Sequence, residues 1–167
     1  QILIQLRKRT PVNVAPLLGV KPRLFAKALG CFLTAEARLH TAEQGASAPR
    51  RQTACDLVAV MDSAAGNCGD GSWGYEFDVQ TRWAYYAAGS PNLIATFFVG
   101  RGLVEAGASF ATDEWLSRGR AAAKYLATNL VRRTERGSPF FAYTPDSPRL
   151  VHNANLLGAG LVAAAGG

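Results

Sequence analysis

The sequence predicts an all-α fold in which αα-hairpin repeats form an arc, or half, of an (α/α)6 toroid. Three observations lead to this prediction. The chain contains 29 alanines and 17 glycines, and such small residues allow helices to pack closely. Similar segments start at Pro22, Pro91 and Pro148, and their spacings of 69 and 57 residues suit a two-helix unit with a long connection. Nearly uncharged segments also alternate with amphipathic segments along the chain.

The composition is that of one domain with a hydrophobic core. The 167 residues are 49% hydrophobic and 18% charged, and no uncharged apolar run reaches the ~18 residues of a membrane span. The net charge is +6, but the basic residues are scattered, with short clusters at 7–9, 50–51 and 132–133. Because no nucleic-acid-binding motif accompanies them, we expect no nucleic-acid partner.

The cysteines and the N-terminus bear on the compartment. Cys31, Cys55 and Cys68 are odd in number and form no CxxC pair, which favours a reducing compartment over a disulfide framework. The chain begins at Gln1 and shows no charged region ahead of an apolar one, so either a signal peptide has been removed or the chain is a fragment. From the cysteine usage and the absence of a visible signal peptide, we predict a cytoplasmic protein.

Five helices are expected in a domain at 21–167, after a basic, proline-containing segment at 1–20. Helices that are apolar on nearly every face alternate with helices that keep one face in solvent. This alternation is what a ring of αα-hairpins produces, whereas a TPR solenoid has shorter repeats, and a plain helical bundle is the simpler alternative. The predicted helices are 22–40 (inner), 50–64 (outer), 91–106 (inner), 113–133 (outer) and 148–165 (inner).

Local signals support two of the inner helices. Ser-Pro occurs at 90–91 and again at 147–148, which places a serine N-cap before a proline at the first helical position. Gly107 and Gly166 are then expected to end the two helices.

The outer helices carry signals of their own. Leu57 and Met61 share one face of 50–64. Thr112 precedes a first turn with two acidic residues, and two arginines at 132–133 lie near the expected end of that helix, as the helix dipole favours.

Two runs of sequence resemble known proteins. The run GSWGYEFDVQTR at 71–82, followed by GSPN at 89–92, is similar to a loop and helix start in bacterial (α/α)-toroid proteins of polysaccharide-synthesis loci. The run at 143–158 resembles their second signature, so the likeness covers about 15–166. The wider superfamily contains six-hairpin glycosidases, polysaccharide lyases, terpene cyclases and protein prenyltransferases. The resemblance implies the toroid architecture, of which this chain holds about half.

In such a ring, the loops that lead into the inner helices gather at one mouth, and long ordered loops are often functional. The loop at 66–90 contains Trp73, Tyr75 and Phe77, which we expect to form a stacking platform for a sugar ring or an isoprenoid. The alternative is that these aromatic residues anchor the loop between hairpins.

Two carboxylates in the same loop are candidates for acid–base chemistry. Glu76 and Asp78 are two residues apart, so in an extended segment they point to the same side. A pair of carboxylates is the minimum for glycoside hydrolysis. The alternatives are that Asp78 forms a structural ion pair with Arg82 and that Glu76 is simply solvated.

The start of the last helix offers a second set of groups. We expect His152 to act as a general base, with Tyr143 as the proton donor. A Tyr/His pair with Arg or Asn that neutralises a uronate carboxylate is the set that a polysaccharide lyase needs. Gln80 and Arg82 from the long loop, together with Asn153 and Asn155, would position the substrate. The alternative for the two asparagines is a structural bridge between loops.

A metal site is the weaker interpretation. Cys68, Asp70 and the distant His152 echo the zinc ligands of protein prenyltransferases, but the order of Cys and Asp is reversed and no fourth ligand lies nearby. The Lys-Ser/Thr of a phosphate-binding loop is also missing. We therefore predict no metal and no cofactor.

These observations favour a protein that processes a glycan or polysaccharide, as a hydrolase or a lyase. An isoprenoid-handling enzyme and a non-catalytic helical scaffold are the alternatives. Because the chain holds about half a toroid, a homodimer or a missing second half would complete the ring.

Overall fold

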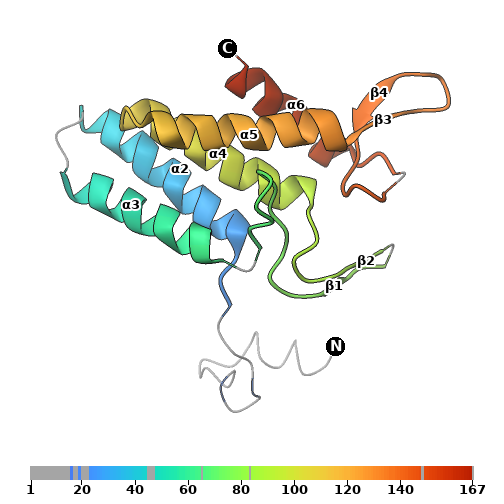
Figure 1. Cartoon of the computed structure of the whole chain (residues 1–167), viewed down its shortest axis with the longest axis horizontal. Helices are drawn as coiled ribbons and strands as arrows, with labels where there is room; N and C mark the ends of the chain where they lie inside the picture. Colours follow the sequence, from blue (N-terminus) through green and yellow to red (C-terminus); the bar gives the residue numbers. More distant parts are fainter. Residues whose placement is uncertain are drawn as a thin grey trace.

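The computed structural model describes residues 16, 19, 23–44, 48–64, 66–82, 84–147 and 149–166, so most of the expected segment at 1–20 lies outside the described residues. Within these ranges the chain forms packed helices and two short antiparallel hairpins (Figure 1). The elements are α2 (Ala26–Ala42), α3 (Ala48–Ser63), β1 (Val79–Gln80), β2 (Tyr85–Tyr86), α4 (Leu93–Ser109), α5 (Asp113–Asn129), β3 (Val131–Arg133), β4 (Pro139–Phe141) and α6 (His152–Ala165).

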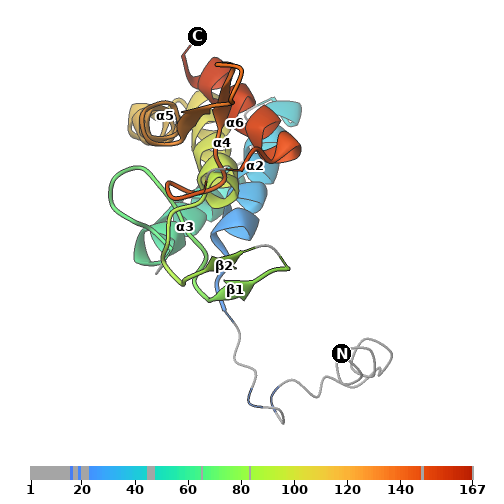
Figure 2. The ribbon, with the colours of Figure 1, turned by 90° about the vertical axis from the view of Figure 1, so that its right-hand side faces the viewer.

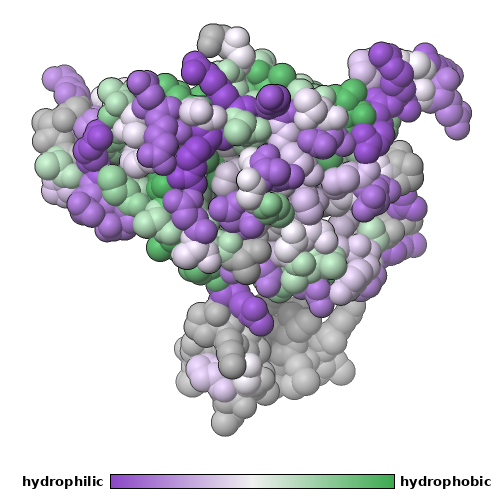
Figure 3. Space-filling view, in the orientation of Figure 1, coloured by the Kyte–Doolittle hydropathy of each residue, from purple (hydrophilic) through white to green (hydrophobic). Residues whose placement is uncertain are grey.

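Helix α4 occupies the centre of the helical body. It packs against α2 on one side, α5 on another and α6 on a third, while α3 covers α2 (Figure 2). Amphipathic α5 buries Trp115, Ala122 and Leu126 on its inner face. Figure 3 shows hydrophilic residues over the outer faces of α5 and α3, as the alternation along the sequence predicts.

Glycines allow the helices to approach closely. A Cβ atom at Gly30 of α2 would lie 2.3 Å from the carbonyl oxygen of Phe98, and one at Gly102 of α4 would lie 2.7 Å from the carbonyl oxygen of Gly30. On the opposite side of α4, a Cβ atom at Gly119 of α5 would lie 2.6 Å from Val104. The helices therefore touch through their backbones, which the many small residues predict.

The predicted fold class is confirmed in its coarser form, as a mainly helical fold with packed helix pairs. The two hairpins are additions that the helical pattern does not predict.

The expectation that all three inner helices are buried on nearly every face is wrong. Helix α4 is the most buried of the three, whereas α2 exposes 61% of Phe32 and α6 exposes 71% of Leu156. Among the described elements, α6 packs against α4, α5 and β4.

The beginning of α4 differs from the expected serine cap. The N-cap is Asn92, whose Oδ1 accepts a hydrogen bond of 2.9 Å from the Ala95 amide. The chain is still extended at Pro91, which forms a β-bridge with Gly74, so the helix starts two residues after the proline. The helix also continues through Gly107 to Ser109, because that glycine is packed against Leu116 rather than placed at a turn.

The other helix boundaries show similar shifts. Helix α6 starts at His152 after Val151, not after Ser147, since Leu150 is bridged to Ala142. Gly166 follows the last turn of α6, as predicted. Helix α5 begins after Thr112, as predicted, but ends at Asn129, because the two arginines expected in its last turn belong to β3.

Among the described helices, none combines the length and the apolar character that a transmembrane helix needs.

Candidate functional site

The loops that lead into α4 and α6 meet at one end of the helical body. Residues of the segments 81–91 and 143–152 line an open pocket of about 1030 Å³ there. Both hairpins lie at this end of the molecule (Figure 1). The pocket therefore lies at the end of the body where α4 and α6 begin.

Hydrogen bonds hold the loop at 73–92 and the loop before α6 against the start of α4. The amide of Leu93, the first residue of α4, donates to the carbonyl of Tyr143 over 2.8 Å. The Asn92 amide donates to the Trp73 carbonyl over 3.0 Å, and Thr96 Oγ1 accepts from the Trp73 amide over 3.0 Å. The aromatic signature loop, the start of α4 and the loop before α6 are therefore held in one rigid arrangement.

Tyr143 is the best-defined polar group of the pocket wall. Its hydroxyl lies 2.7 Å from the hydroxyl of Tyr75, and its ring centroid lies 5.1 Å from that of Tyr86. Partial burial, the hydrogen bond with Tyr75 and the two neighbouring phenols raise the pKa of Tyr143 far above its usual range. Burial also raises the pKa of Tyr75. Both phenols therefore keep their protons at neutral pH.

His152 lies on the pocket wall that Tyr143 also lines. It is the first residue of α6, and its side chain is exposed. Asn153 follows it on the exposed first turn. Asn155 has a structural role, since its Oδ1 accepts a hydrogen bond of 2.8 Å from the Phe141 amide and so ties α6 to β4. Asn155 therefore matches the structural alternative.

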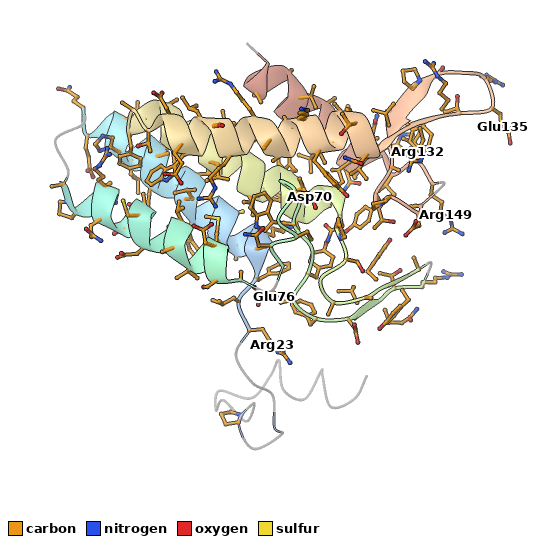
Figure 4. The ribbon with its side chains drawn as sticks, viewed as in Figure 1. Arg23, Asp70, Glu76, Arg132, Glu135 and Arg149 are labelled. Carbon is orange, nitrogen blue, oxygen red and sulfur yellow. The ribbon has the colours of Figure 1, made fainter. Side chains whose placement is uncertain are left out.

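The two candidate carboxylates lie outside the pocket lining. Asp78 Oδ1 accepts a hydrogen bond of 2.8 Å from the Ala88 amide, and the carboxylate also bonds the phenol of Tyr85, whose pKa it raises. Asp78 therefore holds the β1–β2 hairpin in place. Glu76 lies near Arg23, on the side of α2 and away from Arg149 of the pocket (Figure 4).

The environment of Glu76 is partly apolar. Its Oε1 atom is buried and has no hydrogen-bond partner within the described part of the chain. Burial raises the pKa of Glu76, and the positive charge of Arg23 acts in the opposite direction. Glu76 and Asp78 thus occupy separate environments rather than facing one reacting bond.

The aromatic residues of the signature loop lie behind the pocket. Trp73 is only 3% exposed, so its ring offers no face to a substrate and matches the loop-anchor alternative. The Phe77 ring packs against Phe25 and Tyr75 at centroid distances of 5.8 and 6.2 Å. Tyr75 is not among the residues that line the pocket, and its hydroxyl contacts that of Tyr143.

The polar residues that follow in the loop are exposed. Gln80 lies on β1 and donates from Nε2 to the carbonyl of Thr81 over 2.8 Å, and Arg82 follows at the turn of the hairpin. Neither of the two is among the residues that line the pocket, although Thr81 between them is.

Sequence reasoning missed several pocket residues. Tyr85 and Tyr86 of β2 supply its aromatic surface, and Asp146 and Arg149 supply two of its charges. The adjacent tyrosines just before α4 were a usable signal, because exposed aromatic pairs in a loop are common in binding sites. The two charged residues carry no such signal, because their position depends on how the loop at 143–151 folds.

The residues that suggested zinc are engaged elsewhere. Cys68 Sγ contacts the carbonyl of Gly89 at 3.3 Å, and Asp70 Oδ1 accepts bonds from the amide and hydroxyl of Ser72. Within the ranges that the structure describes, no three His, Cys, Asp or Glu side chains gather closely enough to hold a metal ion.

The chain was compared with models of protein families, with curated proteins and with solved structures, and none of these comparisons finds a match.

Proposed function

We propose that the protein processes a carbohydrate polymer by acid–base chemistry in the pocket between the loops at 81–91 and 143–152. One observation carries this proposal: Tyr143, a phenol that keeps its proton, and His152, an exposed imidazole, line the same pocket. A proton donor and a group able to accept a proton are the minimum for such chemistry.

The pocket surface suits a sugar. Tyr85, which is 57% exposed, and Tyr86 supply aromatic rings against which the apolar face of a sugar ring can pack. Ser90 and Thr144 supply hydroxyls that can exchange hydrogen bonds with those of the sugar. A pocket of about 1030 Å³ that opens to solvent admits several units of a polymer.

The available groups favour elimination over hydrolysis. Hydrolysis by the usual route needs two carboxylates that flank the glycosidic bond, and among the described lining residues Asp146 is the one carboxylate. Elimination needs a base, a proton donor and a cation beside the uronate carboxylate. His152, Tyr143 and Arg149 supply these three groups.

The proposed step is a β-elimination. His152 takes the proton from the carbon that bears the uronate carboxylate, and Arg149 balances the charge that develops there. The bond between the neighbouring carbon and the glycosidic oxygen breaks, a carbon–carbon double bond forms, and Tyr143 donates its proton to the departing oxygen. Proton exchange with water restores both side chains, and no oxidant or reductant is needed. Tyr75 is a positioning residue, because it holds the Tyr143 hydroxyl at 2.7 Å.

The test is the formation of unsaturated product. Purified protein is incubated with polyuronates, and the ultraviolet absorbance of the new double bond is followed. We expect His152→Ala and Tyr143→Phe each to lower the rate by about 10²-fold or more. Lys124→Gln, on the outer face of α5, is the matched control and should retain the rate. New reducing ends without a double bond would identify a hydrolase, and intact polymer in every assay would refute the proposed chemistry.

The toroid remains part of the proposal. The succession of α2, α4 and α6 with α3 and α5 on the outside supports an arc of αα-hairpins, and the exposed Phe32 and Leu156 support a further partner at its flanks. The native mass, measured by size exclusion with light scattering, tests whether two copies complete a ring. A mass near twice 17.8 kDa supports a homodimer, whereas a monomer argues against one.

The exposed flanks also favour a second candidate function, a non-catalytic scaffold. Under this alternative, His152→Ala leaves the biological function intact. Replacement of Phe32 or Leu156 by a charged residue abolishes it.

A further inference from the structure

We propose that the β3–β4 hairpin, residues 131–141, is a second binding site, which takes an acidic stretch of a glycan polymer beside the pocket. We call it the arginine hairpin. The inference deepens the proposed function, because it names an anionic polymer as the ligand class. Its direct evidence is nevertheless independent of catalysis.

The first observation is how arginines are paired in the two parts of the molecule. Four arginines of the helical body bind carboxylates: Arg38 and Arg101 bind Glu105, Arg50 binds Glu36 and Glu43, and Arg118 binds Asp62. Arg51 bonds the Phe110 carbonyl, and Arg120 has no ion pair among the described residues. The arginines of the hairpin, by contrast, form no ion pair with a carboxylate of the described residues. These hairpin arginines are Arg132, Arg133 and Arg136.

The bonds of the hairpin arginines go to backbone carbonyls instead. Arg132 donates from Nη1 to Asn129 and Val131 over 3.0 and 2.8 Å, and from Nη2 to Pro145 over 2.6 Å. Arg133 donates from Nη1 to the carbonyl of Gly137 over 2.8 Å. Carbonyl oxygens hold the two guanidinium groups in place but do not neutralise them.

The second observation is the position of this charge beside the pocket. Pro145, which accepts the bond from Arg132, lines the pocket, and Arg149 lines it as well. Arg132 lies at the base of the projecting hairpin, and Arg149 lies beneath it at the same end of the molecule (Figure 4). A chain that leaves the pocket on this side therefore meets Arg132 first.

The hairpin extends the positive surface away from the pocket. Its strands pair with Arg132 opposite Phe140 and Arg133 opposite Pro139, and it projects beyond the end of α5 with a largely hydrophilic surface (Figures 1 and 3). Consecutive strand residues point to opposite faces, so Arg132 and Arg133 present charge on both faces. Arg136 is exposed at the turn beside Glu135. Three arginines and one glutamate give the hairpin a net charge of +2.

The chemistry of the guanidinium group selects the ligand. Arginine presents paired N–H donors that match a carboxylate, and these charge-assisted bonds are stronger than neutral ones. Arg132 is half-buried without a counter-charge, so a ligand carboxylate at this position would compensate its lost hydration. A polymer with a carboxylate on each unit can occupy the pocket and the hairpin together.

The test measures binding rather than cleavage. Oligouronates of increasing length are titrated into the full chain by isothermal calorimetry at two salt concentrations. We expect the double variant Arg133→Gln/Arg136→Gln to weaken the binding of long oligomers about tenfold and to reduce its dependence on salt. The matched control is Arg120→Gln/Lys124→Gln, which removes the same charge from the exposed face of α5 and should bind like the wild type.

Several results would overturn the inference. The hairpin variant could bind as tightly as the wild type, or the control could lose as much affinity as the hairpin variant. A neutral glucan could bind equally well, which would make the arginines irrelevant. Tighter binding of single-stranded nucleic acid that depends on Arg133 and Arg136 would replace the acidic glycan with a different ligand.

The outcomes also separate this inference from the proposed function. If no polyuronate yields unsaturated product, but the hairpin variant still loses affinity and its control does not, the proposed chemistry fails and the arginine hairpin stands. If cleavage proceeds and the KM for long chains is the same in the hairpin variant and the wild type, the chemistry stands and the hairpin inference fails.

Discussion

Helices α4 and α6 are alike in sequence and different in the structure. Each follows a Ser-Pro pair, and each carries few charges, two in α4 and none in α6. Yet α4 buries ten of its 17 residues, whereas α6 buries four of its 14. The difference arises because α4 has helices on three sides, while α6 lies at the edge of the body (Figure 2). The apolar composition of a helix therefore predicts that it packs against other elements, but it does not predict how many elements surround it.

The starts of the two helices differ in the same way. Asn92 is 1% exposed and caps α4 through its own side chain, so that junction is part of the core. Val151 precedes α6 without a side-chain cap, and His152 is exposed to the pocket. One junction is part of the core, and the other exposes polar groups to the pocket that we propose binds a ligand.

A matched pair of leucines gives the largest expected contrast. Leu103 of α4 is 0% exposed, and Leu156 of α6 is the exposed leucine described above. Leu103→Ala should lower the free energy of unfolding by about 2–5 kcal/mol, because it leaves a cavity in the centre of the core. Leu156→Ala should change it by less than about 0.5 kcal/mol. Urea denaturation followed by circular dichroism measures both. Similar losses would mean that α6 is covered in solution, for example by a second copy.

Two glycines provide the next contrast, and here the sign of the effect differs. A Cβ atom at Gly102 of α4 would clash with the Gly30 carbonyl, whereas one at Gly160 of α6 meets no atom within 4 Å. Gly102→Ala should destabilise the protein by about 1–3 kcal/mol. Gly160→Ala should stabilise it by up to about 1 kcal/mol, because alanine favours the helix. Urea denaturation measures the free energy of unfolding of both variants. If Gly160→Ala lowered it, the surface of α6 at Gly160 would not be open to solvent.

The caps provide a smaller contrast. Asn92→Ala removes the bond to the Ala95 amide and should cost about 1 kcal/mol, up to about 2 kcal/mol. Ser147→Ala removes only a bond of 3.3 Å from the Arg149 amide. It should therefore lower the free energy of unfolding much less than Asn92→Ala does. Thermal denaturation of the two variants compares them. Equal losses would mean that the serine, as the sequence predicts, contributes a real cap to α6.

The helices were predictable because their signals are local. The acidic residues after Thr112 and the glycine after α6 mark helix ends by chemistry within one turn. The β3–β4 hairpin was not predictable, because three-residue strands show almost no alternation, and Arg132 and Arg133 fit a helix C-terminus equally well. The pairing of Arg132 with Phe140 and the bond from the Ala142 amide to the Leu130 carbonyl show that the chain has already turned back.

The site was predictable in part for the same reason. His152 and Tyr143 lie near a helix start, and a single sequence suffices to place them in one loop region. The role of Asp78 depends on its bond to Ala88, ten residues away across a hairpin, and no pattern in the sequence encodes that register. The burial of Trp73 likewise depends on Thr96 of α4.

The smallest expected effect is the dependence of stability on alkaline pH that arises from Tyr143, near the start of α6. The folded state raises the pKa of Tyr143 above the ordinary phenol value of about 10, so the folded protein favours the neutral form. This stabilisation is fully present below pH 10. It is lost as the pH rises further, because phenol ionisation then favours the unfolded chain. At pH 10.5 the part of the loss that comes from Tyr143 should be less than about 1 kcal/mol relative to pH 8, and Tyr75 and Tyr125, whose pKa values burial also raises, add to the total. Urea denaturation at the two pH values measures it.

The comparison with α6 variants isolates the tyrosine from other alkaline effects. Tyr143→Phe also removes the bond to Tyr75, so its stability at pH 8 is lower, and the informative quantity is the change between the two pH values. That change should shrink in Tyr143→Phe and stay as in the wild type in Leu156→Ala, which has no titrating group. An unchanged pH dependence in Tyr143→Phe would place the phenol in contact with water. Such a result would contradict the partly buried environment that raises the pKa of Tyr143.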